Sequence, residues 1–372
     1  MKRQLAGAAA LVVAILSISP AAAFAPNSGS ATNALNWLHG LQSTDGTVAG
    51  DATRTEETVW GLVANEHLIA SFSSSAGKTP IDSLRANIVT EEKTAGNIAN
   101  LIMAVSAAKL DPTAFAGRNL LLDLQCTYDA QTGTYNPQLF NDALAILALP
   151  AGGAPSKATT YLASQQQADG GWEFQSGFGS DTNTTAVVLM ALVAAGDLSS
   201  FTRERALAFF KLHQKPSGGF EYAVPFAPPG DSDPNSDALV IEALLATGED
   251  PTGTAWTTAD QKNAVDDLLS FQYPSGGFGF NRPGSSPDAA PDSASTTQAL
   301  PALASRSLPI ERTAATLPVS CPTATTSGPA APHATAPGTR RLAQTGSSPL
   351  APLAFGFGLG FVGWRMRRRT AH

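Results

Sequence analysis

The sequence predicts an all-α fold in which six helix pairs close into a ring, and three observations support this prediction. A helix-like segment recurs, because "SDTNTTAVVLMALVAAG" at 180–196 aligns without a gap with "SDPNSDALVIEALLATG" at 232–248. A glycine-rich turn precedes each of these copies. The segments are apolar almost all round, which is typical of helices buried on every side. Because one helix pair cannot bury its own faces, the pairs must close into a ring or stack as an open solenoid, and we expect the ring.

Residues 1–23 are predicted to form a secretory signal peptide. Lys2 and Arg3 precede an apolar run, and the small residues at 21–23 fit an A-x-A cleavage site. The run is shorter than the ~20 residues that cross a bilayer, so an uncleaved anchor helix is the less favoured alternative.

The ring is predicted over residues 27–304, where six repeats can be distinguished and the first two are the most degraded. Copies of the helical segment also lie at 291–303 and 140–149, and residues 94–112 resemble the same half of a repeat. Three turns share a Gln four residues before the first Gly and an aromatic residue at the end: Gln166, Gly171 and Trp172; Gln214, Gly219 and Phe220; Gln272, Gly277 and Phe278.

Residues 305–341 are predicted to be a disordered linker. They are rich in Ala, Pro, Thr and Ser and have too few large apolar residues to bury a core. We expect an extended stalk.

Residues 342–372 resemble a cell-wall sorting signal of Gram-positive bacteria. The pentapeptide "LAQTG" is followed by an apolar stretch and then by four arginines. Its residues are Leu342, Ala343, Gln344, Thr345 and Gly346. The resemblance implies that a sortase cleaves after Thr345 and joins the chain to cell-wall peptidoglycan, while the hydrophobic helix holds the chain at the membrane beforehand. A plain membrane helix is the alternative.

The repeats resemble the terpenoid cyclase and protein prenyltransferase superfamily, whose fold is an (α/α)6 toroid. The resemblance rests on the Gln-x-x-x-Gly-x-Trp/Phe turns and covers the whole predicted ring. It implies that the Gln and aromatic residues of the turns tie neighbouring outer helices together and are structural.

The segment Asp181-Thr182-Asn183-Thr184 stands where squalene-hopene-type cyclases carry the acid motif Asp-x-Asp-Asp. The middle position, which protonates the alkene in that family, is Asn183, and an amide cannot deliver such a proton. Protonation-initiated cyclisation is therefore not expected, and we predict no catalytic residue.

Polar residues at the head of the inner helices are instead candidates for helix caps or for ligand contacts at the mouth of the ring. They are Asp181, Asn183, Thr184, Asp233, Asn235 and Asp237. Glu242 is a further candidate, because it places a carboxyl group in an apolar helix, where it needs a partner or takes a raised pKa.

No metal site and no cofactor are predicted. His39, His67 and His213 stand singly, and Cys126 has only Asp123 nearby, so no zinc-ligand spacing occurs. A disulfide between Cys126 and Cys321 and two unpaired thiols are equally compatible with the sequence.

The formal net charge is −7, and six of the 23 basic residues lie in the two ends predicted to be removed, whereas all 30 acidic residues lie between them. An acidic mature chain repels phosphate backbones, so nucleic-acid binding is not expected. We predict a secreted, wall-anchored module that binds a small molecule or a surface partner without catalysis. The alternative is an enzyme on terpenoid or polysaccharide substrates; Glu173, Glu221 and Glu242 are its candidate carboxylates.

Overall fold

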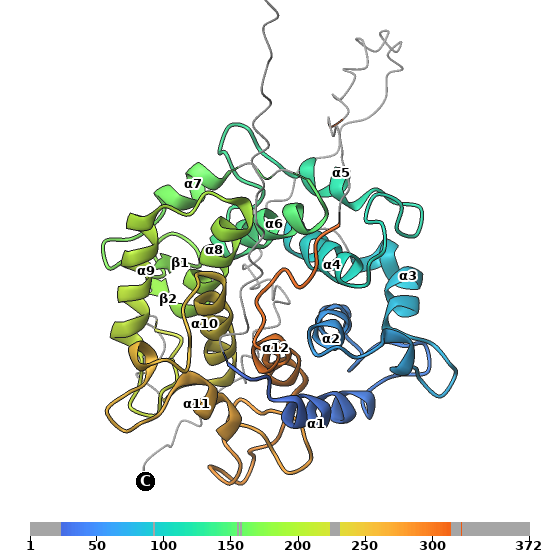
Figure 1. Ribbon diagram of the computed structural model, residues 1–372. Coiled ribbons are helices and arrows are strands. Elements are labelled where there is room, and N and C mark those ends of the chain that lie inside the picture. Colours follow the sequence, from blue (N-terminus) through green and yellow to red (C-terminus); the bar gives the residue numbers. More distant parts are fainter. Residues whose placement is uncertain are drawn as a thin grey trace, which may run out of the picture.

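The computed structural model describes residues 24–91, 94–154, 156, 158–223, 231–313 and 321. Within these residues the structure is a ring of helices with one two-stranded sheet (Figure 1). The inner helices are α2 (Ala52–Ala64), α4 (Ala95–Ala107), α6 (Leu139–Ala151), α8 (Thr182–Ala195), α10 (Pro234–Ala246) and α12 (Ser293–Leu303). The outer helices are α1 (Ser28–His39), α3 (Pro80–Glu91), α5 (Leu120–Gln125), α7 (Thr159–Ser164), α9 (Ser200–His213) and α11 (Ala264–Ser270).

The inner helices form a closed circle. Each packs against the next along the chain, and α12 packs against α2, so that the last repeat meets the first (Figure 1). The predicted (α/α)6 toroid is therefore confirmed, and the open solenoid is excluded. The short strands β1 (Trp172–Glu173) and β2 (Ser180–Asp181) form a hairpin between α7 and α8.

The Gln residues of the glycine turns join consecutive repeats. Gln166 donates from Nε2 to the carbonyl of Gly170 in its own turn (2.8 Å) and to that of Thr202 in α9 of the next repeat (3.0 Å). Gln272 donates in the same way to Gly276 and, at 2.9 Å, to Ser30 in α1. The last repeat is thus hydrogen-bonded to the first, which explains why these turns recur in a closed ring.

A second recurring bond holds each turn to its inner helix. The backbone N–H of the aromatic residue in the turn donates to a side chain one turn into the helix: Trp172 to Thr185, Phe220 to Asp237, and Phe278 to Thr296. Tyr135 donates to Asp142 in the same way. The position requires an acceptor, and a hydroxyl or a carboxyl serves equally.

A segment after α12, residues 304–313, lies across the ring and is called the crossing segment below (Figure 1). Leu308 and Ile310 are buried in it, and the N–H of Thr313 donates to the carbonyl of Ala151 at the end of α6 (2.7 Å). Residues 305–313 of the predicted stalk therefore pack on the ring, because Leu308 and Ile310 give this part of the chain enough apolar surface to bury.

Cys126, which ends α5, forms a disulfide bond with Cys321 across a sequence separation of 195 residues. This resolves the pairing that the sequence leaves open. The bond holds Cys321, beyond the crossing segment, against the third repeat.

The predicted signal peptide, the sorting pentapeptide and the apolar tail lie outside the described residues. Among the helices that the structure does describe, none combines the length and apolarity needed to span a membrane.

Candidate functional site at the head of the inner helices

The first two turns of the inner helices carry polar side chains that are buried. They are Arg54, Thr55, Glu56, Glu57 and Thr58 of α2; Asn141 and Asp142 of α6; Thr182, Asn183, Thr184 and Thr185 of α8; Asn235, Ser236 and Asp237 of α10; and Ser295, Thr296 and Thr297 of α12. The crossing segment packs at the opposite, C-terminal end of these helices. We call the N-terminal end, with these side chains, the polar end of the ring.

Asp181, Asn183 and Thr184 are all buried at the polar end, and Asp181 serves as the N-cap of α8. Its Oδ1 accepts the backbone N–H of Thr184 at 2.6 Å. Burial raises the pKa of Asp181 to about 7, against the lowering effect of the hydrogen bonds that it accepts. The side-chain oxygen of Asn183 lies 3.4 Å from the hydroxyl of Thr182. The predicted capping role therefore accounts for Asp181.

Asp233 and Asn235 make different contacts at the N-terminal end of α10. Asp233 caps the helix by accepting the N–H of Ser236 at 2.9 Å. Asn235 instead contacts α12, where its Nδ2 donates to Gln298 Oε1 at 2.6 Å and its Oδ1 accepts from the Ser295 hydroxyl at 3.2 Å. Asn235 thus belongs to a side-chain network that joins neighbouring inner helices.

Asp237 lies in the wall between α10 and α11 and is not at the mouth of the ring. It accepts the N–H of Phe220 at 2.6 Å and lies beside Asp267, which forms an ion pair with Arg282 at 2.8 Å. Burial first, and the Asp267 charge second, raise the pKa of Asp237 well above its usual value. A Cβ on Gly219 would lie 2.1 Å from Asp267 and 2.6 Å from Asp237, so the glycine makes room for this pair. Among the predicted mouth residues, Asp237 is therefore structural.

A buried ion pair between Arg54 and Glu57 begins the network on α2. Arg54 Nη1 lies 2.8 Å from Glu57 Oε2, and the Thr297 hydroxyl of α12 donates to the same oxygen. Burial raises the pKa of Glu57, while the Arg54 charge and the hydrogen bonds from Thr297 and Gln298 oppose that rise. With Asn235, the network links α2, α12 and α10.

Sequence reasoning missed Arg54 and Glu57. The signal that was available is four consecutive charged or polar positions, "RTEE", at the head of a segment that should otherwise resemble the apolar helices.

Glu242 is buried inside the ring, 2% exposed, in the otherwise apolar helix α10. One carboxyl oxygen accepts the backbone N–H of Leu308 in the crossing segment, and Oε2 has no hydrogen-bond partner among the residues that the structure describes. Burial, and secondarily the charge of Glu57, raise the pKa of Glu242 well above its usual value. Burial and the neighbouring Glu57 charge therefore both favour the protonated form of Glu242.

Three phenylalanines form a row at the polar end beside α6 and α8. Phe140 and Phe174 have ring centroids 6.4 Å apart, and Phe174 and Phe178 have centroids 6.5 Å apart. Phe178 is 44% exposed. This aromatic row was not predicted, because its members come from a helix and from the β1–β2 hairpin, far apart in the sequence.

The buried aspartates predict an unusual pH dependence of stability. Burial raises the pKa of Asp142 and of Asp181 to about 7, whereas an unfolded chain titrates near 3.8. The folded state holds these protons more tightly, so their contribution to stability is complete below about pH 4 and is lost as the pH rises through 7. The melting temperature should therefore be several degrees lower at pH 8 than at pH 5.

Asp142→Asn should reduce that difference, because an amide keeps the acceptor for Tyr135 without a titrating proton. Thermal unfolding at the two pH values measures the effect, and Asp288→Asn, on an exposed loop, is the control. An identical pH difference in Asp142→Asn and in the parent would contradict this assignment.

Metal ligation finds no support in the part of the chain that the structure describes, where no three His, Cys, Asp or Glu side chains are grouped to hold an ion. His39 Nε2 donates to the carbonyl of Ser73 at 2.9 Å, and His213 lies 3.3 Å from Glu221. Glu221 also forms an ion pair with Lys215, and Glu173 accepts the N–H of Gly177 at 2.8 Å. The contacts of Glu173 and Glu221 are therefore local ones in their own loops.

Comparison with known proteins supports the fold. No protein-family model matches the chain, and no curated protein matches it. Among solved structures, the type II terpene cyclase MstE from Scytonema is 17% identical, with a TM-score of 0.53 over 75% of this chain and 97% of that chain. An unsaturated glucuronyl hydrolase specific for heparin is 14% identical, with a TM-score of 0.51 over 75% and 96%. A protein from Actinoplanes is 14% identical, with a TM-score of 0.53 over 75% and 99%. The chain thus shares the toroid fold of a type II terpene cyclase and of an unsaturated glucuronyl hydrolase, which confirms the resemblance at the level of fold.

Proposed function

We propose that this protein is an enzyme that uses acid–base chemistry inside the ring, with Glu242 as the proton donor and Glu57 as its carboxylate partner. The observation that carries the proposal is the pair itself. Among the described residues, Glu242 has an oxygen without a hydrogen-bond partner and forms no ion pair, whereas Glu57 lies 2.8 Å from Arg54. Burial raises the pKa of both groups, but the Arg54 charge opposes the rise only at Glu57, an asymmetry that suits Glu242 as the acid and Glu57 as the base.

The substrate class that fits best is a glycoside. The polar end contains a guanidinium, amide groups and hydroxyls from Arg54, Gln298, Asn235 and Thr297, which are bonded within their own network and would exchange those bonds for the hydroxyl groups of a sugar. The row of Phe140, Phe174 and Phe178 supplies an apolar surface for the faces of sugar rings. The neighbour described as an unsaturated glucuronyl hydrolase shows that this fold serves such chemistry, by analogy only.

An isoprenoid substrate is less well supported. The position that protonates the alkene in squalene-hopene-type cyclases is Asn183, and its neighbour Asp181 is engaged as a helix cap. The type II cyclases among the structural neighbours therefore support the fold of this chain more than the reaction.

An extracellular location suits a glycoside substrate. A signal peptide at 1–23 and a sortase signal at 342–346 would place the ring outside the membrane, joined to peptidoglycan, where cell-wall and environmental polysaccharides are within reach. Sortase and peptidoglycan are the partners that this location implies.

The test is a turnover screen of the mature chain secreted from a Gram-positive host. Neutral and uronic-acid-containing oligosaccharides and geranylgeranyl-bearing aromatics are incubated with the protein, and products are identified by mass spectrometry. Cleaved glycosides that disappear in Glu242→Gln support the proposal. A cyclised isoprenoid, or no product from any class, overturns it.

A second candidate is binding without catalysis. It is favoured by the contacts of the same two acids, because Glu57 is paired with Arg54 and Glu242 accepts from Leu308, so both carry structural roles. Native mass spectrometry of the secreted chain distinguishes the two. A stoichiometric small molecule retained without turnover identifies a binding module.

A further inference from the structure

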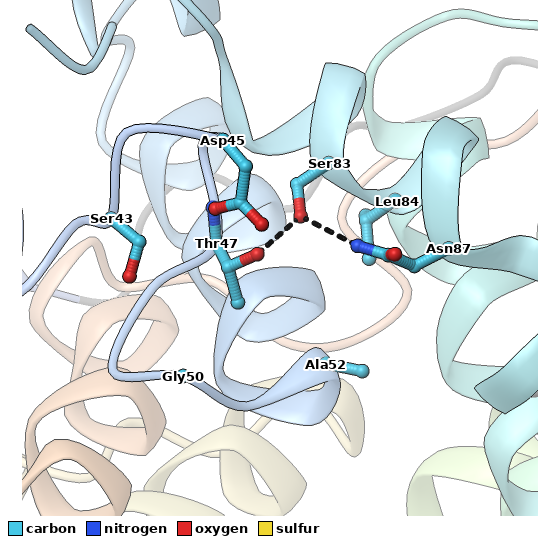
Figure 2. A pocket seen from close by; sticks show the side chains of 8 residues that line it. All are labelled: Ser43, Asp45, Thr47, Gly50, Ala52, Ser83, Leu84 and Asn87. Atoms are coloured by element: carbon cyan, nitrogen blue, oxygen red, sulfur yellow. Dashed lines mark hydrogen bonds between the residues drawn. The ribbon is translucent and has the colours of Figure 1, made fainter.

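A pocket outside the ring interior lies between the loop after α1 and helix α3. It has a volume of about 260 Å³ and is lined by Ser43, Asp45, Thr47, Gly50, Ala52, Ser83, Leu84 and Asn87 (Figure 2). The loop comes from the first repeat and α3 from the second. The proposed catalytic pair makes no part of this pocket.

The lining is a prearranged set of hydrogen-bonding groups. The hydroxyls of Thr47 and Ser83 lie 2.6 Å apart, and Asn87 Nδ2 donates to the Ser83 hydroxyl at 3.3 Å, so three side chains from two repeats form a chain (Figure 2). Asp45 is held in place by accepting the N–H of Thr47 at 3.0 Å. Its carboxylate points toward this chain (Figure 2). A ligand here meets groups whose positions are already fixed.

Two small lining residues, Gly50 and Ala52, leave space in the pocket. A Cβ at Gly50 would meet no atom within 4 Å, and Ala52, at the start of α2, carries only a methyl group. Leu84 is buried and adds one apolar contact. The volume is just below the ~300–1,000 Å³ of typical small-molecule pockets, which suits one or two sugar rings rather than a larger ligand.

We propose that this pocket binds a neutral saccharide as a site separate from the catalytic one. Hydroxyl groups both donate and accept, so they can donate to Asp45 and exchange hydrogen bonds with Ser43, Thr47 and Asn87. None of the lining residues is basic, and the Asp45 carboxylate repels anions, so a uronic acid or sulfated sugar is disfavoured. A separate sugar site would hold a polysaccharide on the ring independently of turnover.

The experiment measures saccharide binding by saturation-transfer NMR and titration calorimetry on the full mature chain. The probes are maltotetraose, cellotetraose and N-acetylated chitotetraose, with a heparin tetrasaccharide as the anionic probe and a chitosan tetramer as the cationic one. Glu242→Gln serves as the background, so that turnover does not consume the ligand. We expect one neutral probe to bind in the millimolar range.

Two variants assign the binding to the pocket. Ala52→Leu fills it and should abolish binding, and Asn87→Ala should weaken binding roughly three- to tenfold through loss of one or two neutral hydrogen bonds. The matched control is Asn36→Ala, an exposed asparagine on α1 outside the pocket. Binding that survives Ala52→Leu, a preference for a charged probe, or no binding of any probe overturns the proposal. Because the readout is binding in a Glu242→Gln background, failure of the proposed catalysis leaves this result unaffected.

Discussion

Glu242→Gln should lower kcat/KM on the cleaved glycoside by at least about 100-fold, the typical contribution of a positioned general acid. The amide has the same shape and can still accept from Leu308, but it has no proton to give. Its stability should stay within about 1 kcal/mol of that of the parent, because one uncharged buried group replaces another at a position where Oε2 has no partner among the described residues. Activity therefore falls while stability is kept, which a structural role for Glu242 does not predict.

Two further variants test the role of Glu242 in catalysis. Glu242→Met introduces the residue that the equivalent position of α8 carries, Met190, so the helix should fold while the activity is lost. Glu57→Gln removes the close partner of Arg54 and should also reduce kcat, but at a cost in stability, because it leaves the buried guanidinium with the exposed Asp51, at 3.7 Å, in place of a buried counterion at 2.8 Å. The rates and the unfolding curves are measured together. Full activity in Glu242→Gln would exclude this residue as the acid.

The ring could be predicted because the contacts that join its repeats recur at regular intervals along the sequence. The Gln-x-x-x-Gly-x-Trp/Phe turns recur, and each Gln reaches the next repeat, so a pattern read along the chain corresponds to contacts between neighbours. Closure follows from the same rule, since Gln272, in the turn between α11 and α12 of the last repeat, reaches Ser30 at the start of the first.

The candidate site was harder to predict because its residues differ from those at the equivalent positions of the other repeats. Arg54 and Glu57 stand in one of the degraded repeats, where alignment to the other copies gives little guidance. Asp237 was expected at the mouth, yet it occupies the position of Thr185 and Thr296 and accepts the N–H of the aromatic turn residue. Sequence alone does not show that a carboxyl and a hydroxyl serve the same purpose there. The crossing segment was missed because low-complexity sequence surrounds its two apolar anchors.

The second large expected effect is a loss of stability when an aromatic residue of a glycine turn is removed. Trp172→Ala should destabilise the protein by about 3 to 5 kcal/mol, the usual cost of removing a large aromatic side chain from a core. Trp172 is fully buried, and its indole Nε1 donates to the carbonyl of Leu162 at 2.8 Å, which fixes α7 to the turn. The cavity would open between α7 and α8, where α7 has only six residues to hold it in place. Urea unfolding of the parent and the variant gives the difference in free energy.

Trp172→Phe separates the aromatic volume from the indole hydrogen bond. Phe220 and Phe278 occupy the equivalent turns and are likewise fully buried, so a phenyl ring fits this kind of site. The Leu162 carbonyl keeps a partner, because the N–H of Gln165 also donates to it, so the variant should lose only about 1 kcal/mol. Leu212→Ala, at a position 76% exposed on α9, is the surface control and should change stability by less than about 0.5 kcal/mol. If Trp172→Ala cost no more than Trp172→Phe, the turn aromatics would not be what holds the outer helices to the ring.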